Sequence, residues 1–98
     1  MTNLEITKLC AEAMGIPHTV CADRYKVNFV EILDHRNPGN GGEYDPINND
    51  AQAMKIIKEF PYIAIKAMQA ELEKTPIENC DFNMAICEYI AKMKQETK

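Results

Sequence analysis

One stretch of turn-forming residues, 31–50, most constrains what this chain can fold into. It holds three of the four glycines of the chain, together with two prolines and four asparagines. These residue types favour turns, because glycine accepts positive φ, proline fixes φ, and the asparagine side chain bonds to the nearby backbone. No long helix or strand is expected to run through this stretch. The chain should therefore fold as short separate elements on either side of it.

The same stretch carries the negative charge of the chain. Its acidic residues are Glu31, Asp34, Glu43, Asp45 and Asp50. Arg36 is its one basic residue, so the stretch has a charge of −4, which equals the formal net charge of all 98 residues. We expect residues 34–49 to form an acidic loop, rich in glycine and asparagine, within a single domain that spans residues 1–98.

Apolar spacing predicts a first helix over about residues 3–14. Thr2 and Glu5 match a capping box at its start, and Gly15 suits its C-terminal end. The residues that recur at helical spacing on one face are Ile6, Leu9, Cys10, Ala13 and Met14.

Three more segments have helical character. Asn48 or Asn49 can cap a helix that Pro61 ends or kinks, and Asp81 is a suitable cap for the last helix. Residues 62–73 favour a helix, although a strand could begin at Tyr62. The expected apolar faces of these segments are, in chain order, Ala53, Ile56, Ile57 and Phe60; then Ile65, Met68 and Leu72; and finally Ala85, Ile86, Tyr89, Ile90 and Met93.

Residues 25–33 favour a strand, because Tyr25, Val27 and Phe29 alternate with polar residues. The helical spacing of Phe29 and Leu33 is the alternative. A lone strand is unstable, so it needs a partner, either residues 43–44 or a strand from a second chain in a homodimer. The sequence thus predicts an α+β fold, a small helix-dominated single domain with three or four helices and a short antiparallel β element.

Composition narrows the functional classes. The chain is 46% apolar and 27% charged, which is typical of a globular domain. It lacks the basic excess that favours direct nucleic-acid binding. No apolar run approaches the roughly 18–20 residues that cross a bilayer, and residues 1–14 do not resemble a signal peptide. We therefore expect a cytoplasmic protein without membrane contact, whose four cysteines are thiols.

The residue pattern favours a protein without catalysis, metal or cofactor. There is no serine, and no CxxC or HxxxH spacing. The nearest pair of metal ligands is His18 and Cys21, which we expect in a short loop, and Cys10 should lie in the core. Gly39-Asn40-Gly41-Gly42 does not match a phosphate-binding loop, and the neighbouring acidic residues would repel phosphate.

Two motifs resemble a known family. The first motif is the run from Tyr44 to Met54, followed by Ile56-Ile57-Lys58-Glu59-Phe60, and the second is the run from Phe82 to Ala91. Both are similar to segments of the phage ABA-sandwich domain proteins. The N-terminal helix that ends in Met14-Gly15 is similar too. The resemblance implies a β layer between helical layers, a phage or prophage origin and a bacterial host cytoplasm. It implies no catalytic residue.

These observations favour a non-enzymatic phage accessory protein that binds a bacterial protein. A basic host protein that handles nucleic acid or serves in defence, such as a CRISPR effector, would complement the acidic loop. The phage protein would inhibit this host protein by binding to it. The expected contact residues are Glu31, Asp34, Glu43, Tyr44, Asp45 and Asp50, with Tyr44 as an exposed aromatic anchor. The alternatives are a loop that serves only solubility and helix initiation, a sponge for a nucleotide or other small molecule, and a virion morphogenesis component.

Overall fold

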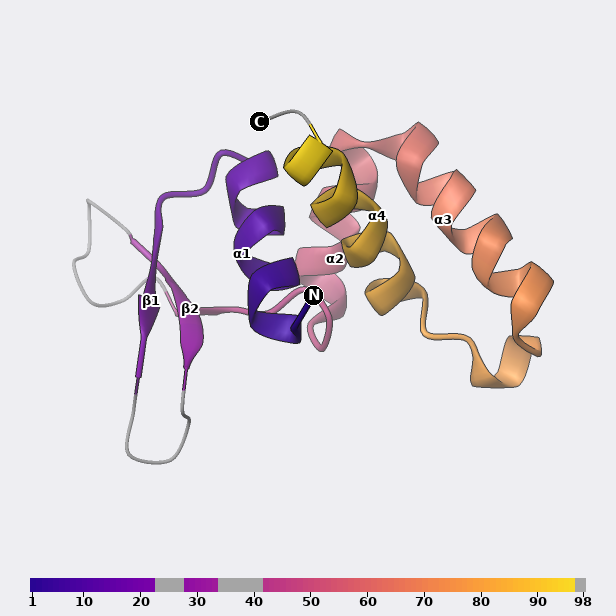
Figure 1. Cartoon of the computed structure of the whole chain (residues 1–98), viewed down its shortest axis with the longest axis horizontal. Coiled ribbons are helices and arrows are strands. Elements are labelled where there is room, and N and C mark those ends of the chain that lie inside the picture. The colour runs from indigo at the N-terminus through magenta and orange to yellow at the C-terminus, as the bar shows by residue number, and fades with distance from the viewer. Residues whose placement is uncertain (23–27, 34–41, 97–98) are drawn as a thin grey trace.

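Four helices and a three-stranded sheet form the part of the chain described by the computed structural model, which is residues 1–22, 28–33 and 42–96 (Figure 1). This arrangement confirms the α+β class. The elements in chain order are α1 (Asn3–Ala13), β1 (His18–Cys21), β2 (Phe29–Ile32), β3 (Glu43–Tyr44), α2 (Asp50–Glu59), α3 (Pro61–Lys74), the 3-10 turn η1 (Ile77–Asn79) and α4 (Phe82–Glu96).

Helices α1, α2 and α4 begin where local capping signals predict them, and residues 62–73 are helical, as the sequence favours. The side chains of Thr2, Asn49 and Asp81 each accept a hydrogen bond from a backbone N–H in the first turn, at 3.0 to 3.1 Å. Phe60 separates α2 from α3, and Pro61 occupies the first turn of α3, where its missing N–H costs nothing. No helix in these described ranges is both long and apolar enough to cross a membrane.

The sheet has the order β1-β2-β3, and both of its strand pairs are antiparallel. The pairing of β2 with residues 43–44 confirms one of the two predicted partners. The loop expected at His18–Cys21 is wrong, because these four residues form β1 against β2. The expectation of a loop throughout 34–49 is wrong at Glu43–Tyr44, which form β3. Residues 34–41, and residues 25–27 of the expected strand, lie outside the described part.

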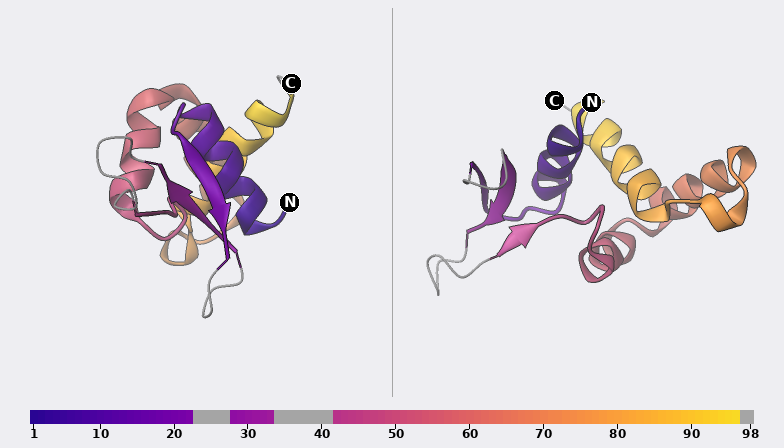
Figure 2. Two further views of the ribbon diagram at one scale, coloured as in Figure 1. Left: turned by 90° about the vertical axis from the view of Figure 1, so that its left-hand side faces the viewer. Right: turned by 90° about the horizontal axis from the view of Figure 1, so that it is seen from below.

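The sheet lies at one end of the molecule, and the helices all lie on one side of it (Figures 1 and 2). Helix α1 packs against β2 and also against α4, so α1 is the layer that joins the sheet to the other helices. The described residues therefore do not form the layer order that the family resemblance implied, with a sheet between helical layers. One face of the sheet has no described helix over it.

The core fills the space between that inner side of the sheet and the helices. Its largest fully buried side chains include Val30 from β2, Ile56 from α2, and Ile86 and Ile90 from α4. The two buried cysteines join α1 to α4, since the Cys10 thiol donates to the Cys87 carbonyl at 3.4 Å, and this confirms Cys10 as a core residue. Tyr89, expected in the buried stripe of α4, is instead 37% exposed.

Candidate functional site

The register of the sheet brings two of the predicted contact residues together. Glu31 of β2 lies directly opposite Glu43 of β3, and Thr19 of β1 lies opposite Glu31 on its other side. Directly opposite residues share a face, with Cβ atoms about 5 Å apart. Because side chains alternate along a strand, Phe29 and Cys21 are on this same face. We call Thr19, Cys21, Phe29, Glu31 and Glu43 the open sheet face, because no described helix covers it (Figure 2).

Tyr44 points to the other side of the sheet. It lies opposite Val30, and its side chain is only 3% exposed in the core. The prediction that Tyr44 is an exposed anchor is therefore wrong, because Tyr44 is buried. The reason is the two-residue period of a strand, which sends neighbouring Glu43 and Tyr44 to opposite faces.

Asp45 and Asp50 stabilise the connection between β3 and α2. The Asp45 carboxylate accepts a hydrogen bond from the Asn48 amide at 3.0 Å, and the Asp45 N–H donates to Gln52 Oε1 at 2.6 Å. The Asp50 carboxylate accepts from the Asn83 amide of α4 at 2.8 Å. These carboxylates are engaged in turn formation and in attaching α2 to α4, which agrees with the structural interpretation of the motif. Asp34 lies outside the described residues.

Cys21 extends the chemistry of the open sheet face. Its thiol donates a hydrogen bond to Glu31 Oε2 at 3.0 Å. This hydrogen bond from the neutral thiol, partial burial and the negative charge of Glu31 raise the pKa of Cys21. Sequence reasoning missed Cys21 and Phe29 as members of the face. The β-branched Thr19 and Val20 were the available signal, but a four-residue strand is too short to show its period.

Replacing Glu31 with glutamine is expected to increase the alkylation rate of Cys21 several-fold near pH 8. Glutamine has no negative charge to oppose the thiolate, and its amide N–H can donate to the thiolate, so the pKa of Cys21 falls and more thiolate is present. The measurement is iodoacetamide labelling with peptide mapping by mass spectrometry. Glu43→Gln is the matched control on the same face. An equal increase in both variants would contradict a specific Cys21–Glu31 contact.

The predicted metal pair is separated by the fold. His18 and Cys21 stand three positions apart in β1, so their side chains point to opposite faces of the sheet. The His18 ring nitrogen Nδ1 instead lies 2.8 Å from the Ile16 carbonyl oxygen. Within residues 1–22, 28–33 and 42–96, no three His, Cys, Asp or Glu side chains are grouped so that they could hold a metal ion.

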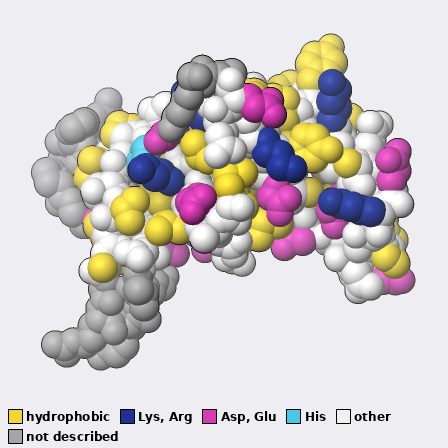
Figure 3. All heavy atoms as spheres, viewed as in Figure 1, with side chains coloured by type: hydrophobic (Ala, Val, Ile, Leu, Met, Phe, Trp, Pro, Cys, Tyr) yellow, Lys and Arg dark blue, Asp and Glu magenta, His cyan; other side chains and the backbone are white. Residues whose placement is uncertain are grey.

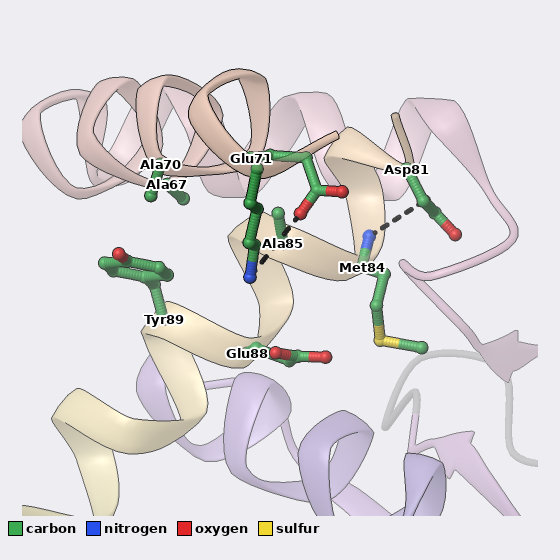
Figure 4. Close-up of a pocket in the computed structure, with 9 residues that line it drawn as sticks. Ala67, Ala70, Glu71, Asp81, Met84, Ala85, Glu88 and Tyr89 are labelled. Carbon is green, nitrogen blue, oxygen red and sulfur yellow. Dashed lines mark hydrogen bonds and ion pairs between the residues drawn. The ribbon is translucent and has the colours of Figure 1, made fainter. Parts of the chain in front are cut away.

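A pocket of about 200 Å³ lies between α3 and α4 (Figure 4). Small side chains at Ala67 and Ala70 leave this space open. Two of its three carboxylates have contacts, since Glu71 lies 3.9 Å from the Lys74 ammonium and Asp81 caps α4, and Glu88 is the third. The pocket is thus a packing gap with an acidic rim, which would repel phosphate.

A second pocket, of about 290 Å³, lies between the start of α1 and the β2–β3 strands. It borders the open sheet face at Glu43, and Asp45 also contributes to its wall. Its remaining polar lining consists of three asparagines, a threonine and a tyrosine, namely Asn3, Asn28, Asn48, Thr7 and Tyr44. Carboxylates and amides together favour a cationic or amide-bearing group over an anion.

Comparisons with protein-family models, with curated proteins and with solved structures gave no match to this chain. The resemblance to the phage family remains a prediction from the quoted motifs.

Proposed function

We propose that this protein is a non-enzymatic binding protein that contacts a basic surface of a bacterial protein through the open sheet face. The observation that carries the proposal is the register of β2 and β3, which sets Glu31 directly opposite Glu43 on the sheet face opposite the buried Val30 and Tyr44. Of the six contact residues predicted from the sequence, these two remain as the centre of the site.

The physical argument rests on charge and partial burial. Two carboxylates on adjacent strands make a local negative potential that attracts arginine and lysine side chains. Both side chains are half-buried, so water screens them less than it screens a surface charge. Phe29 on the same face supplies apolar area beside them, and aromatic residues are enriched in protein interfaces.

The charge distribution favours a protein partner over a nucleic acid. Over the helices in the view of Figure 3, acidic and basic side chains are interspersed. A nucleic-acid interface usually needs a basic patch or stripe that tracks the phosphate backbone. The sponge alternative gains no support from the two pockets, because each has at least two carboxylates in its wall.

The motif resemblance supports a biological role for such binding. A phage protein that covers a basic surface in the host cytoplasm would block a nucleic-acid-handling protein, and inhibition of a defence system such as a CRISPR effector is the role we propose. The acidic face would then act as a competitor for the site where the host protein binds nucleic acid.

Capture from a bacterial lysate tests the proposal with matched variants. The double variant Glu31→Gln with Glu43→Gln is expected to lose the basic protein that the wild type captures, with affinity reduced by about tenfold to hundredfold. Glu59→Gln with Glu78→Gln removes the same charge from exposed positions outside the sheet, and should retain capture. Mass spectrometry identifies the partner, calorimetry measures its affinity, and circular dichroism confirms the fold. Equal capture by both double variants would overturn the proposal.

A further inference from the structure

Helix α3 carries three large apolar side chains on its solvent side, while its Ile63 and Met68 pack against the core. Its fully buried residues are two alanines, Ala64 and Ala67, in a helix that packs against α4 and α2. Three of its large apolar residues, Tyr62, Ile65 and Leu72, are 82%, 50% and 46% exposed. An amphipathic helix normally turns its apolar stripe toward the core. Besides its core-facing side, α3 therefore has a second apolar surface that the described residues leave exposed.

These three residues lie on one side of the helix, with the exposed Gln69 between Ile65 and Leu72. At 100° per residue, positions 62, 65 and 72 fall within one sector of about 80° on the helix surface. We call Tyr62, Ile65 and Leu72 the outer α3 stripe. Helix α3 lies at the end of the molecule opposite the sheet (Figure 1), so the stripe and the open sheet face are separate surfaces.

Two opposite charges flank the stripe on the same side. Lys66 and Glu73 are both exposed, and they are seven residues apart, which is about two helical turns. If a second copy of this helix lies antiparallel to the first, the lysine of each helix stands beside the glutamate of the other, so the two flanks have complementary charges. A partner with a single sign of charge would match only half of such a flank.

We infer that the outer α3 stripe is the contact between two copies of this chain, with the two α3 helices antiparallel about a twofold axis. A twofold axis makes each contact occur twice, so that residue i meets residue j and residue j meets residue i. Centring the pair near residue 69 places Ile65 against Leu72 of the partner subunit. The same axis places Lys66 beside Glu73 of the partner subunit.

The geometry also sets the strength of this dimer. Helix α3 has 14 residues and is about 21 Å long, so one helix pair buries less area than a standard interface. We therefore expect a reversible dimer with a dissociation constant on the order of 100 µM. The contact leaves both open sheet faces uncovered, and it does not depend on the proposed function.

Sedimentation equilibrium over about 10 µM to 1 mM protein tests the inference. The wild type should change from monomer to dimer across this range, and Ile65→Glu with Leu72→Glu should stay monomeric. Lys66→Glu or Glu73→Lys alone should weaken the dimer by about tenfold, because each creates like charges across the axis. A mixture of these two single variants should associate more tightly than either does alone, because it restores opposite charges in the mixed pair.

Lys58→Glu is the control, since it reverses an exposed lysine on α2 without touching the stripe. Circular dichroism should show an unchanged fold in every variant, because all substituted side chains are exposed. A wild type that stays monomeric at the highest concentration would overturn the inference. A dimer that survives Ile65→Glu with Leu72→Glu, or a mixture with no gain over the single variants, would also overturn it.

Discussion

Replacing Ile56 with alanine is expected to lower the free energy of unfolding by about 3 kcal/mol. Ile56 is fully buried and is the one large side chain among the buried residues of α2, whose other buried residue is Ala53. Removing three methylene-sized groups from a packed core loses their transfer free energy and leaves a cavity. Because small domains have only about 5 to 15 kcal/mol of stability, this loss would populate the unfolded state measurably.

Ile57→Ala is the matched control for this prediction. Ile57 is the adjacent residue with the same side chain, but it is only partly buried, so its loss should cost about 1 kcal/mol. The helix propensity of alanine changes both variants equally. Urea unfolding followed by circular dichroism measures both. Equal losses would show that α2 does not attach to the core through Ile56 in particular.

Replacing Tyr44 with phenylalanine is expected to raise the free energy of unfolding by about 1 to 2 kcal/mol. The Tyr44 hydroxyl is buried and has no hydrogen-bond partner among the residues that the structure describes. A buried donor without a partner costs about 1 to 3 kcal/mol, and phenylalanine keeps the ring while it removes that cost. The melting temperature should rise by about 4 to 8 °C per kcal/mol. A lower melting temperature would show that the hydroxyl is satisfied.

The same variant should change how stability depends on alkaline pH. Burial, and then the nearby Cys10 and Cys87, raise the pKa of Tyr44 above its ordinary value of about 10. Above that pH the unfolded chain releases the Tyr44 proton while the folded chain keeps it, so stability falls as pH rises. Tyr44→Phe should have a shallower loss of stability above about pH 10 than the wild type. Parallel unfolding curves against pH would contradict the buried position of Tyr44.

Local sequence signals predicted the helices because helix ends are determined within a few residues. Thr2, Asn49 and Asp81 each bond to a backbone N–H three residues ahead, and Pro61 ends one helix and begins the next. The pairing of β2 with residues 43–44 was also within reach, because the chain offered few other strand partners. The overall α+β class follows from these local features.

The candidate site needed the tertiary structure. Glu43 and Tyr44 are neighbours in the sequence, and both were expected on the contact surface. The register sends Glu43 to the open sheet face beside Glu31, while Tyr44 enters the core. A shift of one residue would exchange these two positions, and only contacts between distant segments determine which of them is adopted.

The sequence by itself determined where α1, α2 and α4 begin, and it placed the acidic residues in one stretch of the chain. The tertiary structure decided which side of each helix is buried, with Ile56 more buried than Ile57 in α2, and the alanines more buried than Ile65 and Leu72 in α3. It also formed the strand β1 where the sequence predicts a loop. The physical reason is the range of the interactions. Capping and turn formation depend on adjacent residues, whereas burial depends on elements that come together only when the chain folds.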